Sequence, residues 1–121
     1  MKLIAAAVFS LIATGAMAGP VGTAKTGLGD VLVAENGMTL YTFAKDTAGV
    51  SNCNDDCAAK WPPYIVDESM KVEGTLSIIE RKDETYQLAQ GGMPLYFWMN
   101  DKAAGDTTGD GVGGVWSVAR P

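Results

Sequence analysis

Apolar and polar residues alternate over short stretches of the chain, a pattern typical of β-strands with one buried face. In the first half, apolar positions cluster at residues 31–34 and 38–43, with Glu35-Asn36-Gly37 between them. Asn-Gly favours a tight turn because both residues tolerate a positive φ. The pattern therefore predicts a hairpin over residues 31–43.

The second half predicts a three-stranded meander and a closing strand, at residues 75–81, 85–89, 93–99 and 115–119. Helical character is confined to residues 55–60, because Pro62-Pro63 cannot continue a helix. The expected fold class is all-β, with one short helical turn near a pair of cysteines. The pattern leaves open whether the sheets close into a barrel or stack as a sandwich.

The segment at residues 37–46 returns in the same register at residues 92–101. The matching positions continue beyond it and are Gly37/Gly92, Met38/Met93, Leu40/Leu95, Tyr41/Tyr96, Asp46/Asp101, Ala48/Ala103, Asp55/Asp110 and Trp61/Trp116. A gap-free register of this kind indicates internal duplication, which determines the architecture. We expect one small domain over residues 31–121, built of two repeats at about residues 31–66 and 75–121.

Each repeat has a tyrosine on a strand and an aspartate just beyond the strand, as Tyr41 with Asp46 and Tyr96 with Asp101. A buried tyrosine hydroxyl needs a hydrogen-bond partner. The aspartate that follows in the same copy could accept this bond, or it could cap the backbone of the next loop. Either role makes the motif structural.

Aromatic residues accompany the motif in both copies. Phe43 lies on the same strand face as Tyr41, and Trp98 on the same face as Tyr96, since alternate strand residues point the same way. Trp61 and Trp116 are expected to return and cover the same core in each copy.

The N-terminal residues 1–18 have the features of a secretory signal peptide. Lys2 is positive, an apolar run follows, and Ala16-Met17-Ala18 is a small-x-small cleavage site, so we expect removal after Ala18. The alternative is a membrane anchor, but the apolar run is shorter than the roughly 20 residues of a spanning helix. Residues 19–30 hold four glycines and one proline and are expected to form a flexible lead-in.

Charge and the predicted export limit the partners. The chain has 14 acidic and 9 basic residues and a formal net charge of −5, with no basic run, which excludes nucleic acid and anionic lipid as partners. No cysteine stands at the cleavage point and no later apolar run could span a bilayer, so we expect no lipid anchor and no membrane insertion after signal removal. The expected location is the periplasm or the exterior.

Two cysteines, Cys53 and Cys57, are expected to form a disulfide, which is the default state in an oxidising compartment. The alternatives are a redox dithiol or half of a metal site. A thioredoxin-like centre has C-x-x-C, whereas this pair is C-x-x-x-C. A thiolate zinc site needs more ligands, and the chain has no histidine.

The loop after the second motif carries Asp101, Asp106 and Asp110 among glycines. Oxygen ligands on a flexible loop suit Ca²⁺, although the spacing matches neither an EF-hand nor the nonapeptide calcium repeat. Ordinary turns use the same residue types. Met38 and Met93 suggest copper(I) ligands, but methionines are more often core filler.

Catalysis is not expected. The chain has no histidine and so no histidine-based triad. Asp46 and Asp101 could pair across a pseudo-two-fold as in aspartic proteases, yet the residues that follow them differ between the copies. An enzyme would need a chemistry that runs on aspartate and tyrosine alone.

The repeated motif resembles the secreted repeat family of unknown function that is marked by Tyr-x4-Asp, many of whose members are predicted lipoproteins. The resemblance covers nearly all of residues 28–121. Its matching pieces are residues 37–46, Ser51-Asn52-Cys53, Cys57-Ala58, Trp61-Pro62-Pro63, residues 93–96, Asp101, Gly105-Asp106, residues 113–116 and Arg120-Pro121. The resemblance implies no catalytic residues. Family members often have a lipobox, which this chain lacks; many have histidine where it has Ser117, and Asp-Gly where it has Asp83-Glu84.

These features predict an exported, non-catalytic repeat domain that acts as a periplasmic binding or envelope-interaction module. Its partner would be an envelope protein or a small ligand. No cofactor is expected, and the alternative function is calcium binding by the loop at residues 101–110.

Overall fold

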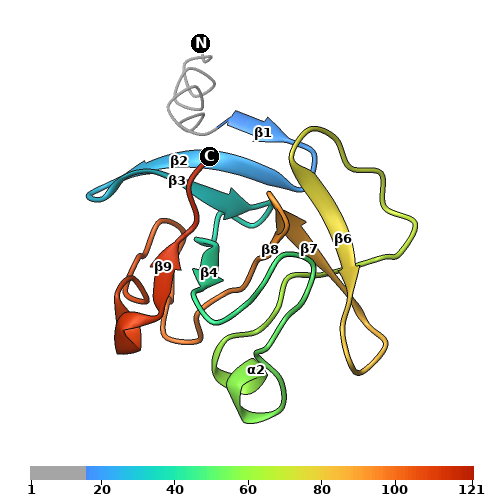
Figure 1. Cartoon of the computed structure of the whole chain (residues 1–121). Helices are drawn as coiled ribbons and strands as arrows, with labels where there is room; N and C mark the ends of the chain where they lie inside the picture. The colour runs from blue at the N-terminus through green and yellow to red at the C-terminus, as the bar shows by residue number, and fades with distance from the viewer. Residues whose placement is uncertain (1–15) are drawn as a thin grey trace.

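The computed structural model describes residues 16–121, whose regular elements are mostly antiparallel strands (Figure 1). In chain order the elements are β1 (Ala16–Ala18), β2 (Val21–Thr26), β3 (Gly29–Ala34), β4 (Tyr41–Phe43), α2 (Asp56–Lys60), β5 (Ile65–Val66), β6 (Leu76–Glu80), β7 (Tyr86–Gln90), β8 (Met93–Pro94), the 3-10 turn η2 (Val112–Gly114) and β9 (Trp116–Val118). The strands form sheets of order β1-β2-β3, β4-β9 and β5-β7-β6, with β8 paired to β7. The all-β prediction is confirmed, and so is the short helical turn beside the cysteines.

Equivalent backbone hydrogen bonds relate the two copies. The β2–β3 hairpin precedes the first motif as the β6–β7 hairpin precedes the second. In the first copy the Leu40 amide donates to the Leu32 carbonyl at 3.0 Å, and in the second the Leu95 amide donates to the Leu88 carbonyl at 3.0 Å. The internal duplication is thus visible in the fold as well as in the sequence.

The tryptophan segments cross between the copies. β9 carries Trp116 and pairs with β4 of the first copy, where Phe43 lies opposite Trp116. The segment after Trp61 joins the second copy, because the Phe97 amide donates to the Pro62 carbonyl at 2.7 Å. Each tryptophan ring nevertheless lies edge-on to the tyrosine of its own copy, Trp61 to Tyr41 and Trp116 to Tyr96, and both belong to one core cluster, as expected. What the sequence did not predict is that the segment carrying each tryptophan joins the other copy.

Tyr41 and Tyr96 meet where the copies join. The Tyr41 amide donates to the Tyr96 carbonyl at 2.8 Å, and the Tyr96 amide donates to the Tyr41 carbonyl at 3.0 Å. This reciprocal pair of bonds is what a local two-fold relation between the copies produces. The two motifs are therefore the centre of the molecule.

Most buried apolar residues of the described chain belong to one of two clusters. One is mainly aromatic and contains Val31, Val33, Tyr41, Phe43, Cys53, Trp61, Tyr96, Trp116 and Val118. The other is aliphatic and contains Val21, Leu32, Ala34, Leu40, Leu88, Leu95 and Ala119. Both clusters draw on both copies, so neither repeat encloses a core of its own.

The expectation of a flexible lead-in over residues 19–30 is wrong. β2 pairs with β3 from Val21 opposite Ala34 to Thr26 opposite Gly29. The glycine-rich composition supplies the turn of this hairpin at residues 27–28 rather than a mobile segment. The pairing and the burial of Val21 in the aliphatic cluster hold the strand in place.

The hairpin predicted over residues 31–43 forms from its turn as far as Leu32 and Leu40. The Gly37 amide donates to the Ala34 carbonyl at 2.9 Å, the Ala34 amide donates to the Met38 carbonyl at 2.9 Å, and Val33 and Thr39 form an antiparallel bridge. After Leu40 the chain leaves β3, so that β4 pairs with β9, while the other edge of β3 pairs with β2. The predicted order of the meander is confirmed, since β6, β7 and β8 pair in sequence, but the third strand ends at Pro94 and not at residue 99.

The predicted signal peptide lies largely outside the described residues, which begin at residue 16. Its last three residues form β1, whose backbone pairs antiparallel with the start of β2. Within residues 16–121, no helix combines the length and apolar character needed to cross a membrane.

Candidate functional site

The motif tyrosines and aspartates bond across the two copies. The Tyr41 hydroxyl donates to Asp101 Oδ2 at 2.6 Å, and the Tyr96 hydroxyl donates to Asp46 Oδ2 at 2.6 Å. The tyrosines are fully buried, and the aspartates are 6% and 7% exposed. The hydroxyl partner is therefore the aspartate of the other copy rather than the one in the same copy. We call these two contacts the reciprocal Tyr–Asp pairs.

The second oxygen of each aspartate fixes the loop that follows it. Asp46 Oδ1 accepts a bond from the Asn52 amide at 2.6 Å. Asp101 Oδ1 accepts bonds from the Thr108 amide at 3.0 Å and the Thr108 hydroxyl at 2.6 Å. The predicted loop-capping role is confirmed. Each carboxylate thus joins its own loop to the tyrosine of the other copy.

Burial raises the pKa values of Tyr41, Tyr96 and Asp46. Loss of solvent raises the pKa of Tyr41, and its bond to Asp101 raises it further. Loss of solvent and the bond to Asp46 raise the pKa of Tyr96 in the same way. Burial also raises the pKa of Asp46, against the hydrogen bonds from Tyr96 and the Asn52 amide. Both phenols consequently remain hydrogen-bond donors over the physiological pH range.

The raised tyrosine pKa values predict a loss of stability in alkali. In the unfolded chain both phenols ionise near pH 10, whereas in the folded chain they keep their protons to higher pH. Their contribution to stability is complete below pH 10 and is lost as the pH rises above it. Urea unfolding followed above pH 9 should give a falling midpoint. The fall should be shallower in a Tyr41→Phe/Tyr96→Phe variant, and an equal slope would contradict the assignment.

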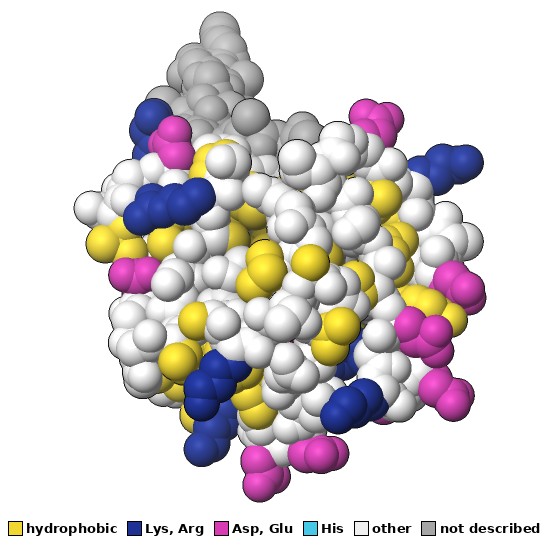
Figure 2. Space-filling view, viewed as in Figure 1, with side chains coloured by type: hydrophobic (Ala, Val, Ile, Leu, Met, Phe, Trp, Pro, Cys, Tyr) yellow, Lys and Arg dark blue, Asp and Glu magenta, His cyan; other side chains and the backbone are white. Residues whose placement is uncertain are grey.

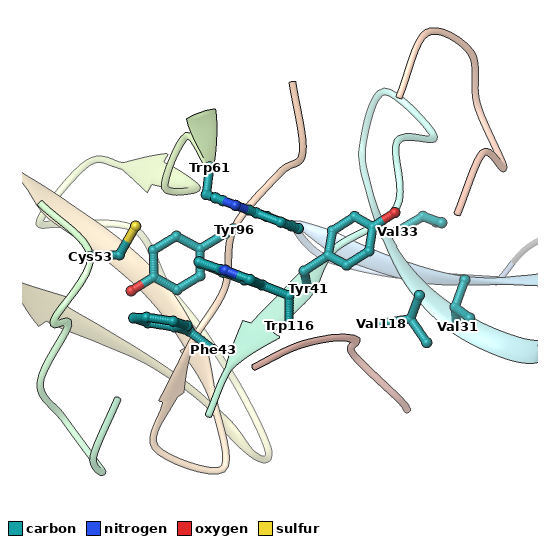
Figure 3. Packing of buried hydrophobic residues seen from close by; sticks show 9 residues of the cluster. All are labelled: Val31, Val33, Tyr41, Phe43, Cys53, Trp61, Tyr96, Trp116 and Val118. Carbon is teal, nitrogen blue, oxygen red and sulfur yellow. The ribbon is translucent and has the colours of Figure 1, made fainter. Parts of the chain in front are cut away.

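An aromatic stack occupies the space between the two pairs (Figure 3). The ring centroids of Trp61 and Trp116 are 3.8 Å apart and the rings are almost parallel, at 2°. Phe43 stacks on Trp116 at 4.3 Å, and Trp98 stacks on Trp61 at 4.0 Å. Figure 3 shows the hydroxyls of Tyr41 and Tyr96 pointing away from the tryptophan pair in opposite directions. The stack and the reciprocal Tyr–Asp pairs form one continuous unit.

Gly109 lies against this unit, and no larger residue fits there. A Cβ atom at this position would come within 2.9 Å of both Trp61 and Tyr41. We expect Gly109→Ala to lower the free energy of unfolding by about 2 kcal/mol, because overpacking forces buried rings to move. Gly27→Ala is the control, since nothing lies within 4 Å of Gly27. Urea denaturation measures both, and equal stability of the two variants would contradict this packing.

A buried arginine network escaped the sequence-based prediction. Arg81 is 5% exposed and donates from Nη1 to Gln87 Oε1 at 2.8 Å and to Ser51 Oγ at 3.0 Å. It also donates from Nη2 to the Cys53 carbonyl at 2.8 Å. Ser51 in turn shares a 2.6 Å hydrogen bond with the Tyr96 hydroxyl. Arg81 thus ties the first loop to the second hairpin, and no spacing or motif marks it.

Cys53 and Cys57 form the predicted disulfide, with their Cα atoms 5.1 Å apart. The bond closes a short loop over the first turn of α2, so its entropic effect on the unfolded chain is limited. A Cys53→Ser/Cys57→Ser variant should lose about 2 kcal/mol of unfolding free energy. Urea denaturation of this variant and of the reduced wild-type protein should agree, and no loss in either would contradict a stabilising bond.

The structure does not bring Asp101, Asp106 and Asp110 together. Asp106 Oδ2 accepts bonds from the amides of Lys102 and Ala103, and Asp110 Oδ1 accepts one from the Val118 amide. Among the described residues, no group of three or more acidic, cysteine or histidine side chains could hold a metal ion. Calcium binding stays a prediction, which a thermal melt after chelation and Ca²⁺ addition tests.

A cleft of about 380 Å³ lies apart from the aromatic stack, since no residue of the stack lines it. It is lined by the start of β2, the loop before β6 and the start of β6, namely Gly19, Pro20, Val21, residues 71–76 and Gln90. Tyr64 stands near it and donates from its hydroxyl to the Pro20 carbonyl at 2.7 Å. Sequence reasoning missed this cleft because it assigned the first of these segments to a lead-in.

Two stretches of the chain, residues 22–64 and 77–120, match the family model described as a secreted repeat of unknown function. No curated protein and no solved structure matches the chain significantly. The two matched stretches coincide with the two copies of the motif described above.

Proposed function

This chain belongs to the secreted repeat family of unknown function, and we propose that it is an exported, non-catalytic binding module of the cell envelope. The observation that carries this proposal is that the side chains of the repeated motif are buried and fully hydrogen-bonded. The hydroxyl of each motif tyrosine and both oxygens of each motif aspartate already have hydrogen-bond partners inside the protein. Buried and bonded in this way, they are unsuited to act on a substrate.

The absence of histidine from the whole chain supports the same conclusion. Histidine is the usual acid or base near neutral pH. The titratable residues of the motif are buried tyrosines and aspartates, and burial raises the pKa of Tyr41, Tyr96 and Asp46. These groups support the interlocked fold, which leaves the surface for binding.

The cleft beside β2 is the site that we propose for the ligand. Its volume falls within the range of small-molecule sites. Pro20 and Val21 are buried, and Val72 and Leu76 are half-buried, so the floor is apolar. Lys71 and Glu73 are exposed at the rim. This combination suits a small amphiphilic molecule with an apolar body and a polar head.

The surface favours a small ligand over a large protein partner. On the face drawn in Figure 2, apolar side chains lie in small separate patches among polar surface. The exposed large apolar residues of the described chain are Leu28, Val50, Ile65 and Met99, which come from four separate segments. Protein-binding surfaces usually have larger continuous apolar patches. An envelope protein is therefore the second candidate partner.

The proposal can be tested with a panel of small amphiphiles, using the amide NMR shifts of residues 19–121, the expected exported form, as the readout. We expect shifts at residues 71–76 and Gln90 that saturate with ligand concentration. Thr75→Arg puts a large charged side chain at the cleft and should abolish these shifts. Thr47→Arg is the matched control, since Thr47 is also exposed but does not line the cleft. Saturable shifts elsewhere, or none with any compound, would overturn the proposal.

Export is a separate part of the proposal. The predicted signal peptide and the secreted nature of the family support it. Fractionation of cells that express the full chain, with mass measurement of the product, tests both the periplasmic location and cleavage after Ala18.

A further inference from the structure

The aromatic stack is a continuous series of ring-to-ring contacts. Trp98, Trp61 and Trp116 are in ring-to-ring contact at 4.0 Å and 3.8 Å. Trp98 is half-buried, whereas Trp61 and Trp116 are 4% and 5% exposed. The tryptophans thus lead from the solvent boundary into the core. Electron exchange between aromatic rings weakens steeply with distance, and van der Waals contact is the most favourable case.

Each inner tryptophan also contacts one motif tyrosine. Tyr41 lies edge-on to Trp61 with ring centroids 5.3 Å apart, and Tyr96 lies edge-on to Trp116 at 5.1 Å. A phenol that loses an electron becomes strongly acidic, so its oxidation is favourable only where a base can take the proton. Asp101 and Asp46 are such bases, each 2.6 Å from its tyrosine hydroxyl.

We propose that the tryptophan stack and the reciprocal Tyr–Asp pairs form a relay that carries an oxidising equivalent from the surface to a buried tyrosine. An oxidising radical, such as a peroxyl radical, removes one electron from Trp98 and becomes a hydroperoxide anion. Trp61 then supplies an electron to oxidised Trp98. Trp61 in turn receives an electron either directly from Tyr41 or from Trp116, which receives one from Tyr96.

The atoms balance at the tyrosine. Its O–H bond breaks as it loses the electron, and the proton bonds to the carboxylate of its partner, Asp101 for Tyr41 and Asp46 for Tyr96. The products are a neutral phenoxyl radical and a neutral carboxylic acid, and only one electron has left the protein. A one-electron reductant, such as an enediol of the ascorbate type, then reduces the phenoxyl radical to a phenolate. The phenolate takes its proton back from the carboxylic acid, which restores the starting pair.

The relay would move the site of oxidation in an exported domain from Trp98, at the solvent boundary, to a buried tyrosine. Phe43 ends the stack at 4.3 Å from Trp116 and is too difficult to oxidise to carry the charge further. The buried tyrosines are therefore the end of the path. This role is independent of the cleft and of its ligand.

Pulse radiolysis of the full-length folded protein with azide radicals, which oxidise tryptophan, tests the relay directly. In the wild-type protein the indolyl radical absorption should decay as the phenoxyl absorption grows, at a rate independent of protein concentration. The growth should slow in D₂O, since an O–H proton moves. A wild-type protein that forms no phenoxyl radical by an intramolecular step would overturn the proposal, whatever the variants do.

Three double variants test which tyrosines and aspartates take part in the relay. Asp46→Asn/Asp101→Asn keeps the side-chain shape but removes the base, and phenoxyl growth should slow by about a hundredfold. Tyr41→Phe/Tyr96→Phe should abolish the growth, whereas Tyr64→Phe/Tyr86→Phe should leave it unchanged, because neither Tyr64 nor Tyr86 contacts a tryptophan of the stack. The opposite pattern in the two tyrosine variants would overturn the assignment. If a variant does not fold, the rates of phenoxyl growth in H₂O and D₂O, measured on the wild-type protein, still test whether the tyrosine loses its proton during the transfer.

Discussion

Replacement of Asp101 by alanine is expected to lower the free energy of unfolding by about 3 kcal/mol. The carboxylate accepts three hydrogen bonds, from the Tyr41 hydroxyl and from the amide and hydroxyl of Thr108. Alanine leaves the buried phenol without its charged acceptor and frees the loop that Asp101 caps. Urea denaturation followed by tryptophan fluorescence measures the change.

Asp106→Ala is the matched control for this prediction. Asp106 lies in the same loop and carries the same charge, but it accepts only exposed backbone bonds from Lys102 and Ala103. Its loss should cost about 1 kcal/mol, as for a loop or helix cap. If both variants lost the same stability, the reciprocal Tyr–Asp pair would contribute nothing beyond a loop cap.

Trp61→Ala is expected to be the most destabilising single change, at about 4 kcal/mol. Trp61 is 4% exposed and contacts Trp116, Trp98 and Tyr41, so its removal opens a cavity between the two copies. Near-ultraviolet circular dichroism should lose intensity at the same time, because the stacked rings produce it. Urea denaturation gives the change in free energy.

Trp98→Ala provides the comparison for Trp61. Trp98 occupies the half-buried end of the stack, so part of the cavity would fill with water. The loss should be clearly smaller than for Trp61, about half as large by the usual dependence on burial. A larger loss for Trp98 than for Trp61 would contradict the central position of Trp61.

The repeat and most strands were predictable from the sequence because local pattern determines them. The register between residues 37–46 and 92–101 identifies equivalent positions, and alternation marks the strands around them. Neither feature says which copy supplies the partner. A bond from Tyr41 to Asp46 and a bond from Tyr41 to Asp101 are equally compatible with the repeated spacing, and only the fold selects Asp101.

The missed features depend on contacts between distant segments. β2 has few apolar residues and several glycines around it, so its strand character comes from pairing with β3. Arg81 is charged and follows an ordinary strand, and its burial depends on acceptors from Ser51, Cys53 and Gln87. Such residues carry no local signal, since the same sequence at a free strand end would be exposed.

The measurement that tests the central claim most directly is a pair of double-mutant cycles on Tyr41. The first combines Tyr41→Phe with Asp101→Ala, its partner in the other copy, and the second combines Tyr41→Phe with Asp46→Ala, the aspartate of its own copy. If the motif interlocks the copies, the first cycle gives a coupling free energy of about 1–2 kcal/mol and the second is additive within about 0.5 kcal/mol. Coupling of Tyr41 to Asp46 with none to Asp101 would contradict the reciprocal exchange on which the fold and the proposed functions rest.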